Sequence, residues 1–220
     1  MMCPILGGSC NLLNNRGIKL GAATALASAV LDQEQVSFPD GRLYSESWTL
    51  VIFNLLFLGP LFYSLVTPFL SLRKTILKNI IDYLGLVTIH SAIYSIVHRF
   101  MHKVTAFRPI HKHHHKYKET VLPSNANAVS PNEFIFAYMF PFVVGCVLIK
   151  PTSFSLSIAT IFVSVFNLCV HSESLAHLKW LKWFVTPFEH LNHHKTKSPN
   201  YSAPTISWSK IKNSLINKWN

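Results

Sequence analysis

The sequence predicts an all-α fold: a polytopic membrane helix bundle of about four spanning or re-entrant helices with a cytosolic histidine-rich helical cap. Two observations support this fold class. Half of the 220 residues are hydrophobic and only 13% are charged, whereas about 25% of residues are charged in a typical soluble domain. Eleven of the twelve histidines lie between residues 98 and 194, so one region of the chain has an unusual density of imidazole groups.

Four apolar segments are long enough to cross or enter a bilayer: residues 48–72, 79–97, 134–149 and 153–170. The first has no charge and matches a hydrocarbon thickness of roughly 30 Å, and its Gly59-Pro60 pair predicts a kink. The third and fourth have 16 and 18 residues and are short enough to be re-entrant. The short joint between them, which contains Lys150-Pro151, predicts a tight hairpin.

Residues 1–47 show little periodicity. Arg16 and Lys19 precede a small apolar run over residues 20–30, which vaguely resembles a signal peptide. The run is rich in alanine and barely hydrophobic, so we expect residues 1–47 to form a flexible or weakly structured N-terminal tail. Residues 48–220 are expected to form one membrane domain.

The positive charges predict the topology. If all four segments span, residues 1–47, 98–133 and 171–220 share one side of the membrane and hold 16 Lys and Arg, against 4 on the other side. Positively charged loops favour the cytosol. We therefore expect every histidine except His90 to lie on the cytosolic side.

Three histidine boxes follow, each with spacings that place imidazoles on one face of a helix. One H-x-x-x-H box directly continues the second span, and two H-x-x-H-H boxes come later. Their histidines are His98 and His102, then His111, His114 and His115, and finally His190, His193 and His194. His113 is expected to point away from the others, and His90 is expected to be a hydrogen-bonded interior histidine.

Neutral imidazole is a good ligand for iron, zinc, copper and nickel. A structural zinc ion needs four ligands, so eight imidazoles indicate a site for two ions. The H-E-x-x-H pattern of zinc hydrolases and the E-x-x-H pattern of carboxylate-bridged di-iron proteins are both absent from the sequence. Glu133 and Glu189 lie at the third residue after Ser130 and Thr186, where each predicts a capping box. The site is therefore expected to be almost entirely histidine.

These residues resemble the fatty acid hydroxylase and sterol desaturase superfamily of integral membrane di-iron enzymes. The resemblance runs from about Asp82 to Trp208 and rests on the three boxes with their flanking residues. His171-Ser172-Glu173 is similar to an intervening histidine of the family. The chain departs from the family pattern at Ser130, where members often have histidine before the proline, and at Ser209, where they often have aspartate after tryptophan.

The resemblance implies a di-metal oxidoreductase domain over residues 48–220. It implies two iron ions with dioxygen as co-substrate, His171 and His177 as further ligands, and hydroxylation, desaturation or methyl oxidation of a sterol or fatty acyl lipid. An external electron donor such as cytochrome b5 with its reductase is implied too, and the sequence has neither a dinucleotide fingerprint nor a cysteine set for an iron–sulfur cluster. In a eukaryote, the location would be the endoplasmic reticulum membrane.

Two other functional classes compete with the enzyme. A non-catalytic membrane metal-binding protein, or a degenerate relative of the family, would keep the same histidines. Nucleic-acid binding is suggested only by the net charge of +11, and no reader motif or basic stretch interleaved with aromatic residues supports it. The sequence leaves the oligomeric state open.

Overall fold

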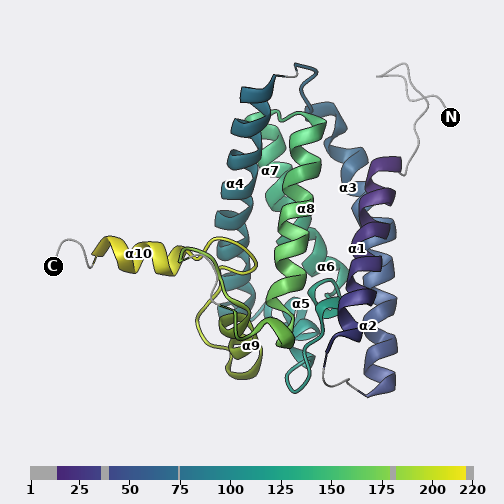
Figure 1. Cartoon of the computed structure of the whole chain (residues 1–220), viewed down its shortest axis with the longest axis vertical. Helices are drawn as coiled ribbons and strands as arrows, with labels where there is room; N and C mark the ends of the chain where they lie inside the picture. Colours follow the sequence, from purple (N-terminus) through teal and green to yellow (C-terminus); the bar gives the residue numbers. More distant parts are fainter. Residues whose placement is uncertain (1–13, 36–39, 74, 179–181, 217–220) are drawn as a thin grey trace.

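The computed structural model describes residues 14–35, 40–73, 75–178 and 182–216, and these form helices joined by short connections, with no named strand among them (Figure 1). Four helices are long and apolar enough to cross a membrane, as the sequence predicts. They are Gly41–Phe69, Ile76–Lys103, Pro131–Ile149 and Ser153–Val170. The all-helical fold class and the integral membrane character of the chain are thus confirmed.

Two of these long helices change their winding partway. The first consists of α2 (Gly41–Phe53), the π-helical η1 (Asn54–Leu58), α3 (Gly59–Val66) and the short η2 (Thr67–Phe69). The third consists of α6 (Pro131–Glu133), the π-helical η5 (Phe134–Met139) and α7 (Phe140–Ile149). Each π segment lies just before a proline, Pro60 or Pro141, whose missing N–H leaves a carbonyl without its usual partner. Wider π turns accommodate that defect without ending the helix.

The other two long helices begin at threonine caps. The Thr75 side chain accepts a hydrogen bond from the backbone N–H of Lys78 at the start of α4 (Ile76–Lys103), and Thr152 accepts one from Ser155 at the start of α8 (Ser153–Val170). Lys150 takes a left-handed conformation with a φ of 50°, which ends α7 and turns the chain into α8. The predicted hairpin between the third and fourth segments is confirmed.

The N-terminal region departs from the prediction. The expectation of a flexible or weakly structured tail is wrong for residues 15–33, which form helix α1 (Asn15–Gln33), and for residues 41–47, which belong to α2. Residues 1–13 and 36–39 lie outside the described residues. A Cβ on Gly21 would lie 2.0 Å from the Leu55 carbonyl oxygen, and one on Gly17 would lie 2.6 Å from the Pro60 Cα. This spacing of small residues lets two helix backbones approach closely.

Within the bundle, α4 packs against both α7 and α8. Short helical segments gather at one end of the bundle, where Figure 1 places α5 and α9. They are α5 (Arg108–Lys112), η3 (His114–Lys116), η4 (Pro123–Ala126), η6 (Glu173–Leu175) and α9 (Pro187–Thr196). The last helix, α10 (Trp208–Ile216), extends away from the bundle. The histidine-bearing segments are therefore brought together at one end.

Candidate metal centre

Nine histidines converge in two adjacent groups whose potential ligand atoms lie within 4.8 Å of one another in each group. Group one consists of His98, His102, His111, His115 and His193, and group two consists of His114, His171, His190 and His194. The groups are neighbours, because the ring centroids of His115 and His194 are 5.0 Å apart. Nine of the ten histidines that the sequence and the resemblance single out therefore lie together.

Each histidine box divides its members between the groups according to spacing. Residues at i and i+4 share a group: His98 with His102, His111 with His115, and His190 with His194. The histidine at i+3 belongs to the opposite group, as His114 and His193 show. The two H-x-x-H-H boxes thus interlock across the centre, and each one supplies ligands to both groups.

The second box does not form the single helix face that its spacing predicts. Helix α5 ends at Lys112, and His114–Lys116 form a separate 3₁₀ turn. Pro109 begins the helix as expected, but the helix does not continue through the box, and His114 joins the group opposite to His111 and His115. The prediction of three ligands on one helix face was wrong for this box because α5 ends before His114. The third box does lie on one helix, α9, and it also supplies both groups.

The spacing of the nitrogens fits a shared ion in each group. In group one, the Nε2 atoms of His98 and His111 are 3.0 Å apart and those of His102 and His98 are 3.2 Å apart. In group two, Nε2 of His190 lies 3.0 Å from that of His171 and 3.2 Å from that of His194. Ligand bonds of about 2.1 Å at angles between 90° and 109° give nitrogen separations of roughly 3.0–3.4 Å. The donor set therefore fits one metal ion per group.

Burial keeps these imidazoles in the form that binds metal. Removal from solvent lowers the pKa of His114, His190 and His194 well below the ordinary value, and lowers the pKa of His115 to about 3. Neighbouring imidazoles lower the pKa of His114 further, since a charge on one disfavours a charge on the next. A neutral ring is the species that coordinates a metal, so these imidazoles are in the metal-binding form at neutral pH.

Four ligand rings are oriented by acceptors on their far nitrogens. The Nδ1 atoms of His98, His171 and His193 donate to backbone carbonyls of Tyr201 at 3.2 Å, Asn167 at 2.7 Å and Ser198 at 2.6 Å. The fourth, His111, lies 2.6 Å from a carboxylate oxygen of Glu133. Such outer contacts fix the tautomer and aim Nε2 at the ion.

The role predicted for Glu133 needs correction. The Ser130 hydroxyl accepts the backbone N–H of Glu133 at 3.2 Å, as an N-cap should. The Glu133 carboxylate does not return to the Ser130 backbone but contacts His111. By contrast, Glu189 forms the complete capping box with Thr186. The site is therefore not purely histidine in its surroundings, because a buried carboxylate supports one of the ligands.

Three histidines lie outside the groups. His177, predicted as a ligand, has an exposed side chain and belongs to neither group; its longer spacing from His171 carries it away from the centre. His113 contacts the Tyr117 hydroxyl at 3.3 Å, in line with its predicted outward orientation. His90 is buried as expected, but neither ring nitrogen has a hydrogen-bond partner among the residues that the structure describes.

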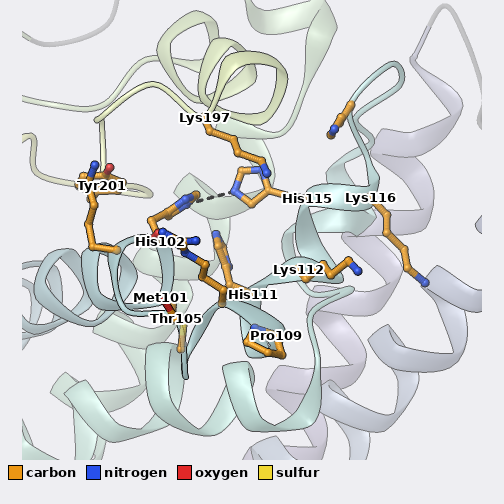
Figure 2. Close-up of a pocket in the computed structure, with 13 residues that line it drawn as sticks. Met101, His102, Thr105, Pro109, His111, Lys112, His115, Lys116, Lys197 and Tyr201 are labelled. Carbon is orange, nitrogen blue, oxygen red and sulfur yellow. Dashed lines mark hydrogen bonds between the residues drawn. The ribbon is translucent and has the colours of Figure 1, made fainter.

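Group one is open on one side. A cavity of about 920 Å³ reaches His102, His111 and His115, and Figure 2 shows these rings facing one another beside Lys197 and Tyr201. Six basic side chains line the same cavity: Lys103, Arg108, Lys112, Lys116, Lys118 and Lys197. All four histidines of group two are buried and none of them lines this cavity, whereas His102 of group one is half-buried. Molecules that enter this cavity could therefore reach an ion held by group one, but not one held by group two.

A family model described as fatty acid hydroxylase matches residues 83–214. That range covers more than half of the chain and includes all nine grouped histidines. No curated protein matches the chain, and no solved structure does.

Proposed function

The chain belongs to the fatty acid hydroxylase family, and on that basis we propose that it oxidises a C–H bond of a membrane lipid with dioxygen at two iron ions. The family implies an oxidoreductase. The observation that supports this function best is the convergence of nine buried or half-buried imidazoles into two adjacent groups. Iron bound there would supply dioxygen activation and removal of hydrogen from the lipid.

The residues of the chain position the ions and control access to them. Group two would hold an ion in a fully buried setting, with His171 fixed by the Asn167 carbonyl. Group one would hold the ion beside the open cavity, where His102 and His115 face the entrance. Glu133 would accept a hydrogen bond from Nδ1–H of His111 and so keep that ring oriented with Nε2 toward a bound ion.

The substrate is proposed to be a sterol or a fatty acyl lipid, and the reaction hydroxylation, desaturation or methyl oxidation. The centre lies at one end of a bundle of four candidate membrane spans, which supports a substrate that arrives from the bilayer. The 16-to-4 distribution of Lys and Arg supports a cytosolic orientation of the histidines. An endoplasmic reticulum location would follow in a eukaryote.

An external electron donor completes the proposal. Two-electron reduction is needed for each dioxygen consumed in a hydroxylation, and the sequence has neither a dinucleotide fingerprint nor a cysteine set for an iron–sulfur cluster. The six basic side chains around the cavity of group one would attract an acidic redox protein, for which cytochrome b5 with its reductase is our candidate. Electrostatic attraction of this kind chiefly increases the rate of association.

Expression in a host that lacks the activity tests the function. Lipids extracted from cells with the wild-type protein are expected to contain an oxidised species that is absent with His193→Ala. His177→Ala, which alters an exposed histidine, should yield the same oxidised species as wild type. If purified wild-type protein binds iron but neither consumes dioxygen nor alters any lipid, the chain is a non-catalytic metal-binding protein instead.

A further inference from the structure

A second cavity lies inside the helix bundle, separate from the basic entrance. It has a volume of about 80 Å³ and is enclosed by α1, α3, α4, α7, α8 and the two π-helical segments. The lining is mainly apolar, with Phe62, Phe142 and Val163 among its walls. None of the nine grouped histidines lines it. It therefore requires an explanation of its own.

His90 gives this cavity its chemical character. The side chain is fully buried and lines the cavity, and both ring nitrogens lack a hydrogen-bond partner within the described part of the chain. Asn127 lines the same cavity, and its Nδ2 is buried without a partner there as well. Leaving such groups unpaired costs about 1–3 kcal/mol each, so their presence together indicates that a polar group from elsewhere pairs with them.

The polar lining selects a neutral ligand. A neutral imidazole offers one donor and one acceptor, and the Asn127 amide offers donors. A hydroxyl group both donates and accepts, so it complements this set. No Lys or Arg lines the cavity, so a carboxylate or phosphate placed there would be a buried charge without a counterion, which is strongly unfavourable.

The cavity lies close to the metal groups along α4 and α8. His90, Tyr94 and His98 lie four residues apart along one face of α4, and their ring centroids are separated by 6.0 Å and then 5.4 Å. Eight residues of α-helix correspond to about 12 Å. On α8, Asn167 lines the cavity and its carbonyl accepts from the ligand His171 at 2.7 Å. The cavity thus lies next to the metal groups on the side of the membrane spans.

We propose that this cavity binds the hydroxyl end of a neutral lipid through His90 and Asn127. The inference rests on the proposed function, and it narrows the substrate class to hydroxyl-bearing lipids, either sterols or long-chain alcohols. The volume is smaller than the roughly 300–1,000 Å³ of pockets that enclose a whole drug-sized ligand. It therefore has room for only one end of the lipid.

Equilibrium binding to the purified, iron-loaded protein in detergent tests this proposal. The probes are radiolabelled cholesterol and 1-hexadecanol, with hexadecane and palmitate as lipids that lack a neutral hydroxyl. Wild-type protein should bind at least one alcohol more tightly than hexadecane or palmitate. His90→Phe, which keeps a flat aromatic ring of somewhat larger size and removes both nitrogens, should weaken binding of that alcohol about tenfold. The alcohol that shows this dependence identifies the lipid class.

Three further variants separate loss of the polar contacts from general effects of a substitution. His90→Asn retains a donor and an acceptor and should weaken binding less than His90→Phe, whereas His177→Phe on the exposed histidine should have no effect. Asn127→Leu provides an independent loss of binding if His90→Phe does not fold. Equal binding of alcohols and hexadecane, or wild-type alcohol binding in both His90→Phe and Asn127→Leu, would overturn the proposal. His90-dependent binding in a protein that oxidises no lipid would refute only the proposed function.

Discussion

Glu133 lies 2.6 Å from Nδ1 of His111 through its Oε1 atom, and both side chains are almost fully buried. The Nε2 atom on the other side of the same ring lies 3.0 Å from Nε2 of His98. The carboxylate therefore accepts a hydrogen bond from the Nδ1–H of His111 and leaves Nε2 on the opposite side of the ring for a metal ion. This hydrogen bond connects α6, the first segment of the third span, to a ligand of group one.

This contact predicts that Glu133 controls metal affinity. Glu133→Ala leaves the Nδ1 proton of His111 without its acceptor, so affinity for ferrous iron should fall about 10–100-fold. Glu133→Gln keeps an acceptor oxygen and should lose less. The measurement is iron content after competition with a chelator of known affinity. Glu46→Ala, a change at a partly exposed carboxylate, is the control, and wild-type affinity in Glu133→Ala would contradict the assignment.

The division of histidines into two groups predicts separable loss of metal. His102→Ala removes a ligand of group one, and His190→Ala removes a ligand of group two. Each variant should reduce bound iron from about two ions to about one per chain, because the other group keeps all four or five of its histidines. The double variant should bind almost none. Iron and protein quantified in the same purified samples provide the measurement.

His177→Ala is the control for that experiment, because its side chain is exposed and outside both groups. It should bind as much iron as the wild type. The two-group description would be wrong if either single variant lost all iron while His177→Ala lost none, since the nine imidazoles would then act as one inseparable site.

Helix α1 should depend on the absence of a side chain at Gly21. A Cβ there would lie 2.0 Å from the Leu55 carbonyl oxygen, and backbone cannot move aside as a flexible side chain can. Gly21→Val should therefore displace α1 and lower the thermal unfolding temperature in detergent, at a cost of at least the 1–3 kcal/mol typical of overpacking. Gly41→Ala is the matched control, because a Cβ at Gly41 meets nothing within 4 Å. Equal melting temperatures for the two variants would contradict the packing.

The sequence predicts the spans because their information is local. Apolar length, the Ser130 cap and the turn at Lys150 depend on neighbouring residues, and the structure has helices at those positions. Helix α1 was missed because its apolar face is weak. The available signal was the Gly17-x-x-x-Gly21 spacing, followed by the buried polar residues Ser28 and Asp32. Asp32 accepts the backbone N–H of Ser124 at 2.9 Å, a contact that no local pattern reveals.

In the candidate site, too, the sequence predicts contacts between near neighbours but not contacts between distant segments. The i, i+4 pairs are visible in the sequence, and each pair shares a group. His114 and His193 each belong to the group opposite to the i, i+4 pair of their own box. That placement depends on where α5 ends and on how α9 packs against α8, and neither is visible in the spacing. Glu133 was read as a cap because its spacing from Ser130 fits one, yet its carboxylate lies 22 residues from the histidine it contacts.

The basic entrance to group one predicts a salt-dependent interaction with the electron donor. Lys112 and Lys118 are exposed and line the cavity that reaches His111 and His115. Replacing both by glutamate reverses the local charge, so the second-order rate of reduction by an acidic donor such as cytochrome b5 should fall about tenfold or more at low salt. The loss should shrink as ionic strength rises, because screening weakens the attraction in wild type too. Stopped-flow reduction at several salt concentrations measures both effects.

Lys212→Glu makes the comparison specific to the entrance. Lys212 is exposed on α10 and does not line the cavity, yet its substitution alters the net charge in the same direction. It should slow reduction much less than the Lys112 and Lys118 pair. Equal slowing by Lys212→Glu and by the double variant, scaled for charge, would show that only the overall charge of the protein matters. A double variant reduced as fast as wild type at low salt would place the donor on another surface.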